Sequence, residues 1–187
     1  MKISVNNSGN LFATSDFHLN HGNILNYTNR HNHFKNVTEM NESLIERFNK
    51  KVSEKDTTII LGDFCFGNVK MFNEFWYALN GTKILVRGNH DKQIPENVFW
   101  CDVAEFSYSG KNFFCSHYAH RVWNKSHHGS YHLYGHSHNS LPDDPTAYSM
   151  DVGVDCHPNY EPFSFQEIVS HMDKKNFKPV DHHTGRY

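Results

Sequence analysis

The first half of the chain holds three short runs of apolar, strand-forming residues, at 11–15, 57–61 and 83–86. The middle run, TTIIL, is β-branched and continuously apolar, which is typical of a strand covered on both faces. We therefore predict three buried strands in this half of the chain.

Between these runs, apolar residues recur at helical spacing in two stretches. The first covers 40–52, with Thr38 as its expected cap, and the second covers 69–79, between the cap Asn68 and the stop signal Gly81. The resulting order of strand, helix, strand, helix, strand predicts an α/β fold with parallel pairing and right-handed crossovers.

The second half alternates strand candidates with turns. The candidates lie at 103–107, 111–116, 131–134 and 147–154, and no strong helical pattern separates them. Strands joined in this way predict an antiparallel or mixed sheet. The capping box SFQE, at 164–167, then indicates the start of a helix with one apolar side.

The composition favours a single domain that acts on a small partner. The 187 residues fit one domain over 1–187, with 180–187 as a loose tail. The formal charge of −2, from 18 basic and 20 acidic residues, creates no strong field for long nucleic acid or a membrane surface. The N-terminus MKISVNNSGN does not resemble an export signal, and no apolar run is long enough to span a membrane. We therefore expect a cytoplasmic protein, and the sequence does not indicate its oligomeric state.

The four cysteines do not form a recognisable metal or disulfide pattern. They lie at 65, 101, 115 and 156, with no CxxC pair and no tightly spaced framework. We expect reduced, mostly buried thiols. Cys65 lies two residues after Asp63, and we expect it to serve packing.

Side chains that can bind metal or move protons follow five of the predicted strands. The stretches are Asp16-Phe17-His18, Gly62-Asp63, Gly88-Asn89-His90-Asp91, Ser116-His117 and Gly135-His136-Ser137-His138. Loops at the carboxyl ends of strands converge in α/β sheets, so we expect these side chains to share one crevice. Carboxylate, imidazole and amide oxygen without thiolate suit Mn, Fe, Co, Ni or Zn better than Ca or Mg.

Each of these short motifs carries little weight alone. Gly, Asn and Asp are ordinary turn residues, and in a chain with 16 histidines a pair such as Asp-x-His arises easily by chance. The presence of all five motifs at strand ends favours a metal site over a set of surface turns.

The ordered set D-x-H, G-D, G-N-H-D, H and G-H-x-H resembles the motif series of the calcineurin-like metallophosphoesterase superfamily, in particular its short single-domain bacterial and phage members. The segments TSDFHLNHGNIL, ILGDFCFG, KILVRGNHDK, YHLYGHSHN and DVGVD carry the resemblance, which spans residues 11–170. One departure is RHNHF at 30–34, where those relatives tend to have Arg-Pro-Phe. The resemblance implies an α/β/β/α sandwich, in which two mixed sheets are flanked by helices.

The resemblance also implies two divalent metal ions, with manganese expected first and iron, nickel, cobalt or zinc as alternatives. The first ion would be held by Asp16, His18, Asp63 and His138, and the second by Asp63, Asn89, His117 and His136. Asp63 would then bridge the two ions. Such a pair can activate a shared water, as hydroxide, for in-line attack on phosphorus.

His90 has no place in either implied metal set, so the resemblance assigns it to the leaving group. There it would protonate the leaving oxygen or stabilise its charge. His90, Asp63 and Asn89 are the expected catalytic residues. Asp91 either orients His90 or closes the turn, and the turn is favoured.

Substrate contacts are predicted at four further positions, each with a structural alternative. His21 either touches the substrate or is a solvated loop histidine, and Arg87 either lies near the phosphate or forms a structural ion pair. His127 and His128 lie in the polar loop 123–130, which either shapes the substrate pocket or is a mobile surface loop.

Together these features predict a metal-dependent phosphoester hydrolase, with small phosphodiesters of nucleotide type as the favoured substrates. A phosphomonoesterase or a nuclease with the same site is the alternative, although the lack of a basic patch disfavours long nucleic acids. Two non-enzymatic alternatives are a scaffold on the same fold and a histidine-rich metal-binding protein. The complete ligand set and His90 argue against both.

Overall fold

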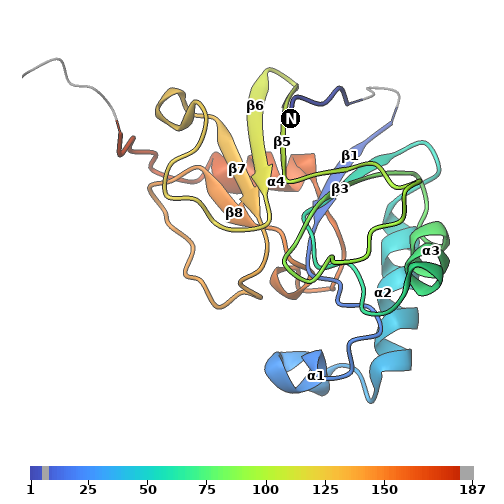
Figure 1. The fold of residues 1–187 in the computed structure, drawn as a ribbon. Helices are drawn as coiled ribbons and strands as arrows, with labels where there is room; N and C mark the ends of the chain where they lie inside the picture. The colour runs from blue at the N-terminus through green and yellow to red at the C-terminus, as the bar shows by residue number, and fades with distance from the viewer. Residues whose placement is uncertain (6–8, 182–187) are drawn as a thin grey trace, which may run out of the picture.

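The computed structural model describes residues 1–5 and 9–181 and, within them, has a mixed α/β fold with two β-sheets (Figure 1). Of the tail predicted at 180–187, residues 182–187 lie outside the described part. None of the helices in the described ranges is both long and apolar enough to cross a membrane.

The first sheet has the strand order β4-β3-β2-β1-β9. Its central strands are β1 (Leu11–Thr14), β2 (Thr57–Ile60) and β3 (Thr82–Val86), which pair in parallel as predicted. At one edge β4 (Trp100–Cys101) continues the parallel order, and at the other β9 (Phe163–Ser164) pairs antiparallel with β1. The sequence predicted neither edge strand, because two residues are too few to show an alternating pattern.

The two helices expected in the first half, α2 (Val37–Lys51) and α3 (Val69–Ala78), cover one face of this sheet. α3 begins after Asn68, as predicted. The predicted cap of α2 was wrong. Asn36 has the extended backbone of an N-cap and its side chain accepts the N–H three residues later, whereas Thr38 already lies in the first turn.

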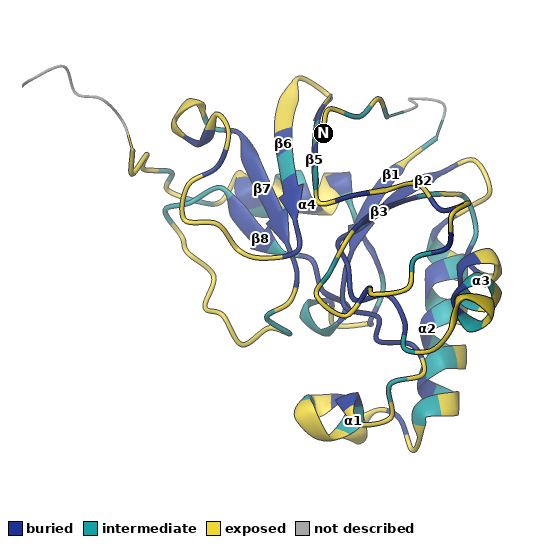
Figure 2. Cartoon of the chain, in the orientation of Figure 1, coloured by how far each residue is buried: buried dark blue, intermediate teal, exposed yellow. Residues whose placement is uncertain are grey.

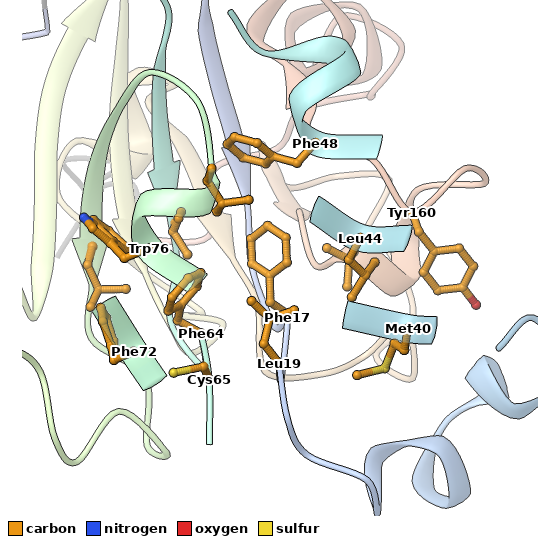
Figure 3. Close-up of a cluster of buried hydrophobic side chains, with 14 of the residues drawn as sticks. Phe17, Leu19, Met40, Leu44, Phe48, Phe64, Cys65, Phe72, Trp76 and Tyr160 are labelled. Carbon is orange, nitrogen blue, oxygen red and sulfur yellow. The ribbon is translucent and has the colours of Figure 1, made fainter. Parts of the chain in front are cut away.

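An aromatic core fills the space between these helices and the sheet (Figure 3). The ring centroid of Phe17 lies 6.0 Å from that of Phe48 and 5.8 Å from that of Phe64, and Trp76 meets Phe64 edge-on at 5.2 Å. Phe17 follows β1 and Phe64 follows β2. The core therefore holds in place the two loops that carry the first predicted ligands.

The second sheet has the strand order β5-β6-β7-β8. Its strands are β5 (Val103–Tyr108), β6 (Lys111–Ser116), β7 (Tyr131–Tyr134) and β8 (Ser149–Asp151). β5 and β6 are antiparallel, whereas β6, β7 and β8 are parallel, so of the two predicted alternatives, antiparallel or mixed, the sheet is mixed. β8 is shorter than predicted because the chain turns into the 3₁₀ helix η3 (Val154–Cys156).

A second apolar core lies between the two sheets. Side chains alternate along the strands, so that Leu11 and Ile59 face this core while Phe12 and Ile60 face the helices. This two-sided burial explains the continuously apolar run TTIIL. Figure 2 shows the central strands almost entirely buried, with exposed residues gathered on the loops and the outer helix faces.

The last helix, α4 (Phe165–Met172), starts with the predicted capping box. The Ser164 hydroxyl accepts a hydrogen bond from the N–H of Glu167, and the Glu167 carboxylate accepts one from the N–H of Ser164. Phe165 and Ile168 point into the core between the sheets. α4 is therefore part of the inner packing.

A loop covers the outer face of the second sheet. The Trp123 ring, from the segment 117–130, packs 5.1 Å from the ring of His132, which is fully buried on that face. In the described part of the chain, the outer helical layer is thus formed by α2 and α3 alone. The remaining short helices are α1 (Ile24–Tyr27), η1 (Asn29–Asn32) and η2 (Ser126–His128).

Candidate metal centre

The loops that carry the predicted ligands meet at the carboxyl ends of the strands. The N–H of Asp16 donates to the carbonyl of Gly62 (3.0 Å), and the N–H of His18 donates to the carbonyl of Asp63 (2.9 Å). The N–H of His136, which follows β7, donates to the Asp16 carboxylate (2.8 Å) and so links the second sheet to the first. The parallel strands of both sheets therefore end in one shared crevice.

Two glycines allow these loops to approach one another closely. A Cβ atom on Gly88 would meet the carboxylate of Asp63 and lie 2.5 Å from its backbone nitrogen. A Cβ atom on Gly135 would meet the hydroxyl of Ser15. Each glycine thus precedes its ligands because no larger residue fits against the neighbouring loop.

Five of the seven predicted metal ligands have a left-handed backbone although none is a glycine. They are Asp16 (φ 57°), His18 (50°), Asp63 (53°), His136 (68°) and His138 (47°). Such conformations cost about 1–3 kcal/mol each and cluster at functional sites, where the surrounding fold enforces them. The strain here coincides with the residues that the motifs singled out.

The first predicted ligand set comes together as expected. One ligand atom from each of Asp16, His18 and His138 lies within 4.8 Å of the others. Oδ1 of Asp16 and Nε2 of His18 are buried and have no hydrogen-bond partner among the described residues. A buried polar atom without a partner is costly, and a cation between these atoms would satisfy both.

The second set also comes together. One ligand atom from each of Asp63, His117 and His136 lies within 4.8 Å of the others. The amide oxygen of Asn89 lies 2.8 Å from Nε2 of His117, so the fourth predicted ligand adjoins this set.

Asp63 lies between the two sets. Its Oδ2 atom is 3.5 Å from Nε2 of His18 and 3.5 Å from Nε2 of His117. Its Oδ1 atom accepts a hydrogen bond from the N–H of His90 (2.8 Å), which fixes the carboxylate and leaves Oδ2 facing both imidazoles. This position fits the bridging role that the resemblance implies.

Without a cation, burial disfavours the charged forms of two members of the first set, Asp16 and His18. Burial raises the pKa of Asp16 to about 7 and lowers the pKa of His18 to about 2, since charge is unfavourable in a buried site. A divalent cation would stabilise the ionised carboxylate and would bind the imidazole in the neutral form it already has. The donors therefore fit a metal ion better than they fit one another.

The contacts of His117 favour a protonated imidazole when no metal ion is bound. Its Nδ1 lies 2.7 Å from the carbonyl oxygen of Leu61 and its Nε2 faces the oxygens of Asn89 and Asp63, so both nitrogens must carry protons to donate. Burial lowers the pKa of His117, but the hydrogen bond and charge of Asp63 outweigh it and raise that pKa to about 9. A metal ion could replace the Nε2 proton, and proton and metal would then compete.

Two residues to which the sequence analysis assigned no role hold His138 in place. Its Nδ1 lies 2.7 Å from the Asp155 carboxylate, which leaves Nε2 for a metal. Asp155 also accepts two hydrogen bonds from the guanidinium of Arg30, at 2.8 and 2.7 Å. Arg30 is fully buried and donates further to the carbonyl oxygens of Asp16 and Phe17. It thereby ties the first ligand loop to the last.

Replacing Arg30 with methionine is expected to lower the free energy of unfolding by about 3–5 kcal/mol, because it leaves the Asp155 carboxylate buried without its main partner. Urea denaturation of the metal-free protein measures this loss. Arg121→Met is the matched control, since Arg121 is exposed and its replacement should change stability by less than about 0.5 kcal/mol. Equal urea midpoints for Arg30→Met and the wild type would contradict the role assigned to Arg30.

His90 and His21 lie beside the first ligand set. The His90 ring is exposed, with its centroid 5.6 Å from that of His18 and 5.0 Å from that of Phe66. His21 stacks on Phe66 at 3.8 Å, and its Nδ1 lies 3.2 Å from Nδ1 of His18. Nε2 of His18 faces the ligand set, so His21 orients that imidazole through a hydrogen bond with its other nitrogen, Nδ1.

Asp91 closes the turn, as the favoured interpretation predicted. Its carboxylate accepts hydrogen bonds from the N–H groups of Asp63, Phe64 and Gly88, at 2.8, 2.9 and 2.8 Å. Asp91 thereby fixes the loop after β3 against the loop after β2. Cys65 is buried in the aromatic core, and burial raises the pKa of its thiol to about 12, which agrees with a packing role.

Arg87 forms a structural ion pair, which was the alternative to a position near the phosphate. Its guanidinium pairs with Asp102 at 2.6 Å and lies over the ring of Trp100 at 4.7 Å. The structure gives no support to substrate contacts at His127 and His128. Both lie on η2, just before β7 begins, whereas the predicted ligands follow the carboxyl end of that strand.

Comparison with known proteins gives a fold and a family. No protein-family model matches the chain. A solved structure from Aquifex aeolicus, of a protein of unknown function, AQ665, is similar over 87% of this chain and 99% of that chain, with a TM-score of 0.64 and 22% sequence identity. That likeness shows a shared fold. The uncharacterized protein MJ1445 of Methanocaldococcus jannaschii is 33% identical over 171 residues, which cover 88% of this chain and 92% of the relative. The chain belongs to the same family as MJ1445.

Proposed function

We propose that this protein is a metal-dependent phosphoester hydrolase of the calcineurin-like metallophosphoesterase type, acting on small phosphodiesters. One observation carries the proposal: the seven motif ligands gather in two adjoining sets with Asp63 between them. The unpartnered Oδ1 of Asp16 and Nε2 of His18 make the first set a site that a cation would complete.

The resemblance assigns the residues of each set, and their proximity in the structure supports the assignment. Asp16, His18, Asp63 and His138 would hold one divalent ion, and Asp63, Asn89, His117 and His136 would hold the other. Their donors are carboxylate, imidazole and amide groups, which suit manganese, iron, cobalt, nickel or zinc. The family resemblance puts manganese first among these. Two such ions would bind the phosphate oxygens and activate the attacking water.

The protein's own groups then position and protonate the substrate. The N–H of His90 fixes Asp63, so the backbone that carries the proposed acid is bound to the bridging ligand. The His90 side chain is exposed at the edge of the ligand sets. From its solvent-facing position it can contact the leaving oxygen of a bound ester. Proton transfer by a positioned histidine contributes roughly 10²- to 10⁴-fold in rate.

The fold supports the same class. Two mixed sheets pack face to face, their strand ends converge on the ligand sets, and a helical layer covers the outer face of the first sheet. These features fit a metallophosphoesterase-type sandwich, with the loop 117–130 in place of the second helical layer. The two non-enzymatic alternatives are a scaffold and a metal-binding protein. Neither of them needs His90 beside two complete ligand sets.

The proposal is tested with protein freed of metal and then given Mn²⁺. We expect hydrolysis of bis-p-nitrophenyl phosphate, slower hydrolysis of p-nitrophenyl phosphate, and loss of both activities on addition of EDTA. Release of p-nitrophenolate is followed by absorbance. If neither ester is hydrolysed with Mn²⁺, Fe²⁺, Co²⁺, Ni²⁺ or Zn²⁺, the proposed function is refuted. A faster reaction with the monoester would instead support a phosphomonoesterase.

A further inference from the structure

A large polar cavity opens beside the first ligand set, and it is not needed to hold a metal. Its volume is about 610 Å³, and His138 forms part of its wall. This size lies within the range of about 300–1,000 Å³ that small-molecule sites occupy. The rest of the wall comes from the segments 26–33, 139–140 and 155–160. A group bound there would adjoin an ester held at the ligand sets.

The cavity wall is polar. None of its lining residues is a lysine or an arginine, and its one carboxylate, Asp155, is already paired with Arg30 and His138. Apart from Asp155 and two tyrosines, the titratable groups of the wall are imidazoles, from His31, His33, His138 and His157. Such a wall favours a group that forms several hydrogen bonds.

Three side-chain amides in the wall are available to bind such a group. Asn26, Asn29 and Asn139 are exposed, and within the described residues their side chains form no hydrogen bond. Each amide offers both donors and an acceptor, so it can pair with the edge of a nucleobase or with sugar hydroxyls.

An aromatic ring at the cavity adds a selective feature. Tyr27 is 73% exposed and lines the cavity, with its ring centroid 6.3 Å from that of His21. Exposed aromatic rings stack on nucleobases, whose faces are planar, and a saturated sugar or an alkyl group does not provide such a face. The combination of free amides and an exposed tyrosine fits a base joined to a ribose.

We propose that this cavity binds the nucleoside part of the substrate, so that the enzyme cleaves phosphodiesters in which one alcohol is a nucleoside. This inference rests on the proposed function and adds the identity of one ester group. Loss of Asn29 or Tyr27 should weaken nucleoside binding most, because one supplies an available amide and the other a stacking surface on the same wall.

The test compares two diesters with one leaving group, thymidine 5′-(p-nitrophenyl phosphate) and methyl p-nitrophenyl phosphate, both with Mn²⁺. We expect kcat/KM for the thymidine ester to exceed that for the methyl ester by about tenfold or more, through a lower KM. Tyr27→Ala and Asn29→Ala should each reduce this ratio by about five- to tenfold. Asn176→Ala, an exposed asparagine after α4 and outside the cavity, should leave both rates and their ratio unchanged.

The outcomes separate this inference from the function on which it rests. If bis-p-nitrophenyl phosphate is not hydrolysed, the proposed function fails. If it is hydrolysed but the thymidine and methyl esters react equally well, only the nucleoside assignment fails. A thymidine preference that survives both substitutions also overturns it, because the nucleoside then binds elsewhere. Thermal unfolding of each variant confirms that loss of these exposed side chains leaves the fold intact.

Discussion

Asp63→Asn is expected to lose both metal ions and nearly all Mn²⁺-dependent hydrolysis. Oδ2 of Asp63 is the atom that lies 3.5 Å from an imidazole of each ligand set, so both sets depend on it. The asparagine can keep the hydrogen bond from the N–H of His90 to Oδ1, but it replaces Oδ2 with a neutral amide nitrogen that repels a cation. Elemental analysis after dialysis against Mn²⁺ measures the metal content.

Unfolding temperature distinguishes loss of metal from loss of the fold. An ion at 100 times its dissociation constant stabilises the folded state by about 2.7 kcal/mol, or roughly 5–10 °C for a domain of this size. Mn²⁺ should produce this shift in the wild type and in Asp173→Asn, which removes an exposed carboxylate at the end of α4. It should produce no shift in Asp63→Asn. Normal manganese content in Asp63→Asn would contradict a bridging carboxylate.

The strands, the two main helices and the ligand loops could be predicted because their signals are local. Apolar periodicity marks buried elements, and the ligands lie within three or four residues of a strand end. The close approach of Gly88 to Asp63 follows from the same motifs, since a glycine before a ligand indicates either a sharp turn or a crowded neighbour.

The support for these ligands could not be predicted, because it depends on residues far apart in the chain. Arg30 and Asp155 are 125 positions apart, and nothing in either segment indicates that they pair. The same limit applies to His127 and His128. Their sequence places them near the last motif, but the direction of β7 separates the two ends of the strand.

The site is also where the fold is least favourable by itself. Left-handed backbone at five ligands and two unpartnered atoms in the first set all oppose folding in the metal-free state. The cores on either side of the first sheet compensate for these costs. Left-handed backbone is therefore concentrated at the ligands, which account for five of the ten non-glycine residues that adopt it in the described part of the chain.

His90→Ala is expected to retain both metal ions and to lose roughly 10²- to 10⁴-fold in kcat. The imidazole of His90 belongs to neither ligand set, and the hydrogen bond that fixes Asp63 comes from its backbone, which alanine preserves. The variant should therefore show the wild-type manganese content and the same Mn²⁺-induced rise in unfolding temperature. His128→Ala is the matched control, because that exposed histidine lies at the opposite end of β7.

The basicity of the leaving group determines how strongly the reaction depends on His90. A proton donor matters most when the departing alkoxide is a strong base, so His90→Ala should slow an alkyl phosphodiester far more than a p-nitrophenyl ester. The variant should thus retain a larger share of wild-type activity on bis-p-nitrophenyl phosphate than on a dinucleotide. Equal losses on both substrates, with the metal content unchanged, would mean that His90 binds the phosphate in place of protonating the leaving oxygen.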